Sequence, residues 1–131
     1  MRYVVVLLIG ALIGSMVTMT ALNALRQASA VSDGIMAVMQ YQMNLVRTDI
    51  GAKRCDAAKP YFQTLLGVAG AIEPAFLPTG GDDVLFKRYA EQLRNRLDEA
   101  LKADATSCRT LTEQLGQVGD SCKACHRDFK Q

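Results

Sequence analysis

The sequence predicts an all-α protein: an antiparallel, up-down-up-down four-helix bundle preceded by an N-terminal hydrophobic anchor helix. Three observations support this fold class. After position 30 the apolar residues recur at steps of three and four, which is the period of a helix. The chain has no Trp, few aromatic residues and little alternation of β-branched residues. Short links between the expected helices are typical of an antiparallel bundle.

The N-terminal segment predicts a membrane anchor. Residues 3–22 are nearly all apolar, and no residue between Arg2 and Arg26 is charged. About twenty apolar residues are enough to span a bilayer. Ala28-Ser29-Ala30 resembles a signal-peptide cleavage site, so the alternative is a soluble domain released after Ala30. We favour the retained anchor, because cleavage there would leave almost nothing before the first domain helix. The chain then divides into an anchor or signal segment, 1–30, and an exported domain, 31–131.

The first two domain helices follow from apolar stripes and their stop signals. The first stripe steps by three and four and ends before Gly51, a natural helix stop; it consists of Met36, Met39, Met43, Val46 and Ile50. A second helix is expected over residues 57–72. Pro60 is tolerated in its opening turn, and Pro74 is expected to end it.

The last two helices follow a Pro- and Gly-rich loop over residues 74–81. Asp82 or Asp83 can cap a third helix that carries Phe86, Tyr89, Leu93, Leu97 and Leu101. Residues 104–107 have capping chemistry and predict a break. The final helix has one apolar stripe made of Cys108, Leu111, Leu115, Val118, Cys122, Cys125 and Phe129. Gly116 and Gly119 weaken this helix, which suggests that a bulky group approaches its backbone there.

Cys122-Lys123-Ala124-Cys125-His126 is the attachment signature of c-type haem. Two thiols three positions apart on a helix point the same way, and the next residue supplies an imidazole to the iron. A thioredoxin-like dithiol would instead follow a strand at a helix N-terminus. A structural zinc site needs four ligands, and His126 is the only histidine in the chain. The pattern therefore favours one covalently bound haem c.

Export also bears on the two remaining cysteines. Haem is attached to c-type cytochromes outside the bacterial cytoplasmic membrane, where disulfides are permitted. In an up-down-up-down bundle Cys55 and Cys108 share the pole away from the haem motif, so we expect a disulfide rather than two buried thiols.

All thirteen acidic residues and thirteen of the fifteen basic residues lie after Ala30, so the exported domain is neutral. This balance excludes electrostatically driven nucleic-acid binding.

The arrangement resembles the cytochrome c′ family, an antiparallel four-helix bundle with the haem motif at the end of its last helix. Residues 115–130 (LGQVGDSCKACHRDFK) are similar to the closing helix of the family, and residues 72–78 (IEPAFLP) to its second loop. Residues 34–39 (GIMAVM) resemble the first helix of its methionine-ligated, low-spin branch. Ser32 stands where the family often places a basic residue, and the domain is shorter than usual.

The resemblance implies that Cys122 and Cys125 bind haem, that His126 is the proximal ligand and that Met36 is the distal ligand. Because the chain has one histidine, a closed sixth position needs another donor, and a thioether raises the potential into the range of an electron carrier. The alternative is that the methionines only pack on the porphyrin and leave the iron open to nitric oxide or carbon monoxide. No constellation for substrate catalysis is present, so we expect no enzyme. Redox proteins, such as respiratory complexes of the membrane, are the expected partners, and the family also implies a homodimer.

Overall fold

The computed structural model of the chain describes residues 2–77 and 83–129, and within them the side chains of residues 10–23, 30–77 and 83–129. Every regular element in these ranges is a helix, which confirms the predicted all-α class. Asp82, one of the two expected helix caps, lies outside the described residues.

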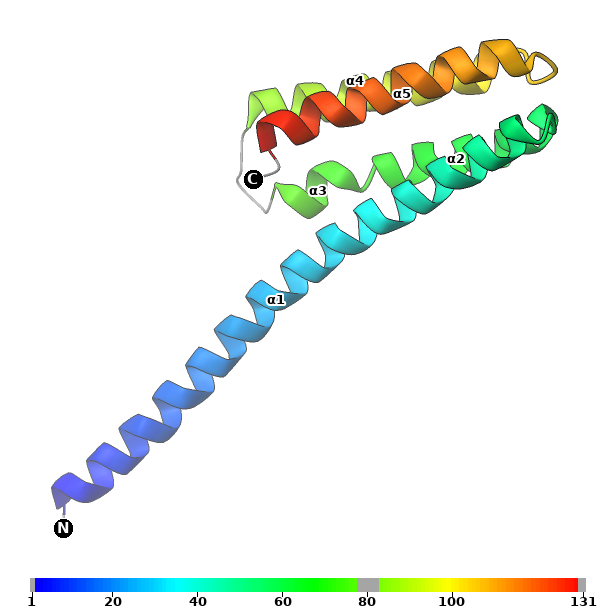
Figure 1. Cartoon of the computed structure of the whole chain (residues 1–131). Helices are drawn as coiled ribbons and strands as arrows, with labels where there is room; N and C mark the ends of the chain where they lie inside the picture. The colour runs from blue at the N-terminus through cyan, green and yellow to red at the C-terminus, as the bar shows by residue number, and fades with distance from the viewer. Residues whose placement is uncertain (1, 78–82, 130–131) are drawn as a thin grey trace.

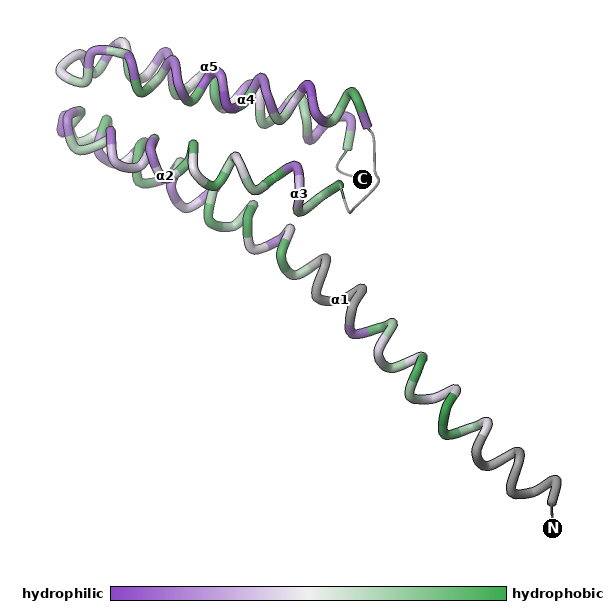
Figure 2. The backbone as a smooth tube through the Cα atoms, turned by 180° about the vertical axis from the view of Figure 1, so that it is seen from behind, coloured by the Kyte–Doolittle hydropathy of each residue, from purple (hydrophilic) through white to green (hydrophobic). Residues whose placement is uncertain are grey.

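The first helix, α1, spans Arg2–Gly51 without interruption, so the expected boundary at residue 30 is not a break in secondary structure. Its second half packs against the other helices and its first half projects away from them (Figure 1). Described side chains of this projecting part, such as those of Leu12 and Met16, are exposed. The colouring in Figure 2 shows hydrophobic stretches along the same part of α1. Among the described residues no helix is both long enough and apolar enough to cross a membrane. The side chains of residues 3–9 of the expected anchor lie outside the description.

The region expected to form the second helix is divided into three short elements. These are the 3₁₀ helix η1 (Cys55–Ala58), α2 (Lys59–Ala69) and α3 (Ile72–Phe76). The single helix predicted over residues 57–72 is therefore wrong in its bounds. Gly70 ends α2, and its N–H bonds the carbonyl of Leu66. Pro74 does not end a helix but lies in the opening turn of α3, where a missing N–H costs nothing.

The last two helices begin and end close to where the sequence predicts. Helix α4 spans Val84–Lys102, and Asp83 caps it by accepting a 2.9 Å hydrogen bond from the backbone N–H of Phe86. Helix α5 spans Cys108–Phe129. In the link between them the Asp104 carboxylate accepts from the backbone N–H of Thr106, which confirms the expected turn chemistry.

In the packed part, α1, α2, α4 and α5 follow one another in alternating directions (Figure 1). Helix α1 packs on α2, α2 on α4, α4 on α5, and α5 on α1. The core between them has six fully buried large side chains: Phe62, Leu65, Leu97, Leu111, Val46 and Val118. Each contributes about 1.5–3 kcal/mol by leaving water. One end of the packed part, the disulfide pole, holds Cys55 and Cys108. The opposite end, the motif pole, holds Phe76, Asp83 and Phe129.

Candidate functional site

The two thiols of the haem motif lie on the inner side of α5. Cys122 and Cys125 are three positions apart, so they share one face of the helix. Both are half-buried, both are free, and both pack against the hydrophobic core. Two free thiols therefore lie on one face of α5, packed against the core.

The environment of these thiols argues against a redox-active dithiol. Burial raises the pKa of Cys122, and the neighbouring Cys125 raises it further. Burial also raises the pKa of Cys125, with a smaller effect from Asp128. A catalytic dithiol needs a lowered thiol pKa, because the thiolate is the nucleophile. Within the described residues, no group of three metal-binding side chains comes together.

His126 is exposed and lies on a flank of α5, outside the residues of this helix that contact α4. Two other residues of α5 mark the side that contacts α4: Gln117 accepts from Arg96, and Asp128 accepts from Tyr89. At 3.6 residues per turn, His126 is rotated by about 180° from Gln117 and by about 200° from Asp128. Phe129, which also packs on α4, is only about 60° from His126, so His126 lies beside the surface of α5 that contacts α4 and not opposite it.

Met36 lies at the same pole as the motif. It is fifteen positions before the end of α1 at Gly51, about 22 Å from the disulfide pole. Cys122 is fourteen positions and His126 eighteen positions after Cys108, so they lie about 21 and 27 Å from that pole. Met36 is half-buried and packs against the core, while Met39 and Met43 are buried.

The chemistry of this donor set fits a c-type haem. Two free thiols on one helical face and the imidazole that follows them are the groups that such a haem requires, and a thioether such as that of Met36 can supply a sixth iron ligand. An added Cβ at Gly116 or Gly119 would meet nothing within 4 Å. The backbone of α5 is therefore open beside the motif, and no other part of the described chain crowds either glycine.

The end of α5 is held by contacts that the sequence did not predict. Phe129 packs edge-on against Phe86 and Tyr89, with ring centroids 5.2 and 6.1 Å apart. The Tyr89 hydroxyl donates to Asp128; this bond is the main cause that raises the pKa of Tyr89. Hydrogen bonds from Arg127 and then Tyr89 lower the pKa of Asp128. The sequence placed Tyr89 only on an apolar stripe, where its hydroxyl was the one signal that a polar partner was needed.

At the disulfide pole the expected pairing is present. Cys55 and Cys108 are joined by a disulfide, with their Cα atoms 5.3 Å apart. Buried Asp49 forms an ion pair with Arg54 in the turn that leads to Cys55. This turn contains Lys53 at a φ of 60°, a left-handed conformation. The disulfide therefore joins η1 to the first residue of α5, far from the haem motif.

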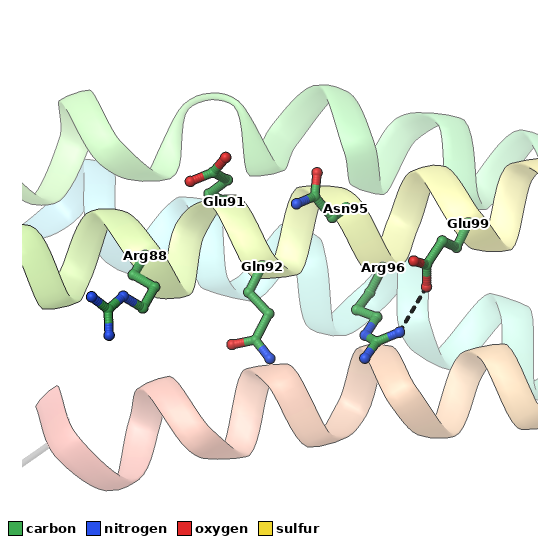
Figure 3. Close-up of a pocket in the computed structure, with 6 residues that line it drawn as sticks. All are labelled: Arg88, Glu91, Gln92, Asn95, Arg96 and Glu99. Atoms are coloured by element: carbon green, nitrogen blue, oxygen red, sulfur yellow. Dashed lines mark hydrogen bonds and ion pairs between the residues drawn. The ribbon is translucent and has the colours of Figure 1, made fainter.

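Two hollows of the described surface lie outside this site. Figure 3 shows the first, which is lined by Arg88, Glu91, Gln92, Asn95, Arg96 and Glu99 of α4. It is a solvated surface of mixed charge in which Arg96 pairs with Glu99. The second is an apolar groove between α1 and α2 that includes Val31, Val38 and Val68. Neither hollow contains a residue of the haem motif.

Basic residues near the motif are balanced by acidic ones. Lys123 pairs with Asp120, and Arg127 pairs with Asp128. The motif pole therefore carries a mixed solvated surface rather than a basic patch, in line with the neutral charge of the domain.

Comparison of the chain with protein families, with curated proteins and with solved structures finds no match.

Proposed function

We propose that this protein is a monohaem c-type cytochrome that carries single electrons, built on a cytochrome c′-like four-helix bundle. One observation carries the proposal: Cys122 and Cys125 are free, half-buried thiols on one face of α5, directly followed by His126. The alternating directions of the four packed segments support the antiparallel bundle (Figure 1). When bound, the haem supplies a one-electron redox centre.

Four side chains hold the haem in this proposal. Cys122 and Cys125 attach it covalently, and His126 is the proximal iron ligand. Met36 is the distal ligand, because it lies at the same pole and packs on the core that also contacts both thiols. Met39 and Met43, which follow Met36 on α1, are buried, and this burial keeps water away from the distal side of the haem. Electron transfer then needs only an accessible haem edge, so no substrate-binding residue is required.

The location of the protein is part of the proposal. Covalent haem and the Cys55–Cys108 disulfide both favour the periplasmic side of a bacterial inner membrane. Residues 3–22 anchor the chain there, and α1 continues directly from them into the packed helices. The motif pole, where α1 leaves the packed part, is then the pole nearer the membrane. This position suits exchange of electrons with membrane respiratory proteins. Release after Ala30 is the alternative.

Covalent attachment is tested by expressing the chain with the haem-maturation machinery and staining a denaturing gel for haem. We expect haem on the wild type and none on Cys122→Ala/Cys125→Ala. The matched control is Cys55→Ala/Cys108→Ala, which removes the other two cysteines and should keep its haem. A wild-type chain that carries no haem under these conditions would refute the proposal.

The distal ligand is tested by visible spectroscopy of the oxidised and reduced protein, with and without carbon monoxide. We expect low-spin bands that carbon monoxide leaves unchanged. Met36→Ala should convert the iron to high spin, whereas Met43→Ala, a change at a buried methionine of the same helix, should leave it low-spin. A high-spin wild type, or a Met36→Ala variant with an unchanged spectrum, would rule out Met36 as ligand.

A second candidate function has one observation in its favour. Met36 packs against the core as Met39 and Met43 do, which is the behaviour of a methionine that fills space. If all three only fill space, the sixth iron position is open and the protein binds nitric oxide or carbon monoxide. A homodimer fits either function, and the apolar groove between α1 and α2 is then the surface to examine.

A further inference from the structure

Helix α4 holds the last turn of α5 through aromatic rings. Phe86 is buried in the first turn of α4, and the centroid of its ring lies 5.8 Å from the ring centroid of Phe76 at the end of α3. Phe129, the last residue of α5, packs edge-on against Phe86 and against Tyr89 one turn further along α4. Edge-to-face packing of this kind favours one relative orientation of the rings. The end of α5 therefore has a preferred position against α4.

A hydrogen bond adds a polar contact to the same turn. The Tyr89 hydroxyl donates to Asp128, a residue 39 positions away in sequence. The other carboxylate oxygen of Asp128 accepts from Arg127 Nε at 2.9 Å, which is a contact within α5. The bond from Tyr89 therefore ties this carboxylate to another helix. A hydrogen bond to a charged acceptor is stronger than one between neutral groups.

These contacts set the direction of His126. Asp128 and His126 are two positions apart, so their side chains differ by about 200° around the axis of α5. Holding Asp128 and Phe129 against α4 fixes the rotation of the last turn. The same rotation places His126 on the flank of α5 next to this contact surface. If the last turn were free to rotate or fray, the imidazole would have no fixed direction, because helix ends fray readily.

We propose that Tyr89 is a positioning residue for His126: through its bond to Asp128, and with Phe129 packed on Phe86, it fixes the turn of α5 that carries the proximal imidazole. This inference rests on the proposed function, because it assigns His126 to the iron. Tyr89 itself does not touch the iron ligand. Its role is to keep the imidazole in one orientation, which strengthens axial ligation.

The first test uses the unloaded chain and needs no haem. Tyr89→Phe removes the hydroxyl and keeps the ring, and Tyr41→Phe makes the same change at an exposed tyrosine of α1. We expect amide hydrogen exchange of residues 122–129 to become about threefold to tenfold faster in Tyr89→Phe and to stay unchanged in Tyr41→Phe. Asp128→Asn keeps an acceptor oxygen and should retain most of the protection. Asp128→Ala should match Tyr89→Phe, and combining these two changes should add little.

The second test uses the haem-loaded protein. Tyr89→Phe should shift the midpoint potential and should let carbon monoxide change the spectrum of the reduced protein, which carbon monoxide leaves unchanged in the wild type, since a loosely held imidazole weakens axial ligation. Tyr41→Phe should behave as the wild type. Faster exchange without any change in potential or carbon monoxide binding would overturn the inference, because Tyr89 would then be only structural. Unchanged exchange would overturn it directly. A wild type without haem is a separate outcome, which refutes the proposed function and the inference with it.

Discussion

Removing the Cys55–Cys108 disulfide should lower the free energy of unfolding by about 4 kcal/mol. The two residues are 53 positions apart, and their bond links η1 to the start of α5. A crosslink across that separation restricts the unfolded chain, and in the chain-entropy model the restriction is worth about 4 kcal/mol at 25 °C. A domain of this size has a total stability of about 5–15 kcal/mol. The bond therefore provides a large share of the stability.

The assay is urea unfolding of the unloaded chain, followed by circular dichroism with and without reductant. Reduction breaks the bond without changing any side chain volume elsewhere. At slopes of about 1–3 kcal/mol per M urea, a loss of about 4 kcal/mol moves the midpoint by about 1.3–4 M. Cys55→Ala/Cys108→Ala should unfold at or below the reduced midpoint and should not respond to reductant.

The matched control is Cys122→Ala/Cys125→Ala, which keeps the disulfide and should lose the same stability on reduction. Equal midpoints for the oxidised and reduced wild type, within about 1 kcal/mol, would refute the reasoning. Such a result would mean that the reduced, unfolded chain is already restricted, or that the bond is strained in the folded state.

Three other changes test the fold and the site. Phe62→Ala empties a fully buried position of α2 and should cost about 3–5 kcal/mol in urea unfolding; a loss below about 1 kcal/mol would contradict its place in the core. Asp83→Ala removes the acceptor for the Phe86 N–H and should cost about 1 kcal/mol, whereas Asp83→Asn, which keeps a capping oxygen, should cost less. In the unloaded chain burial raises the pKa of Cys122 above its ordinary 9.0. The Cys122 thiol therefore stays neutral to a higher pH in the folded state than in the unfolded state. Its contribution to the free energy of unfolding is present below pH 9 and is lost as the pH rises through the raised pKa. Unfolding measured above pH 9 should show a smaller decline in Cys122→Ala than in the wild type; equal declines would show that this thiol is not responsible.

Much of the fold could be predicted because helix ends depend on local chemistry. The capping carboxylate of Asp83, the stop at Gly51 and the single stripe of α5 each act through residues within a few positions of one another. The split of the second helix was missed because a proline is compatible with the first turn of a new helix as well as with the end of an old one. The sequence predicts that Pro74 ends a helix, whereas in the structure Pro74 lies in the first turn of α3.

For the candidate site, too, some features follow from the sequence alone and others depend on the tertiary structure. The sequence by itself determined the helical class and placed two thiols on one face of a helix with an imidazole directly after them, because the helical period fixes these. Only the tertiary structure decided which flank of α5 faces α4, and hence that Asp128 meets Tyr89. The period of a stripe identifies the apolar face of a helix. It does not fix how neighbouring helices are rotated and offset, and polar contacts between flanks 39 positions apart depend on that rotation.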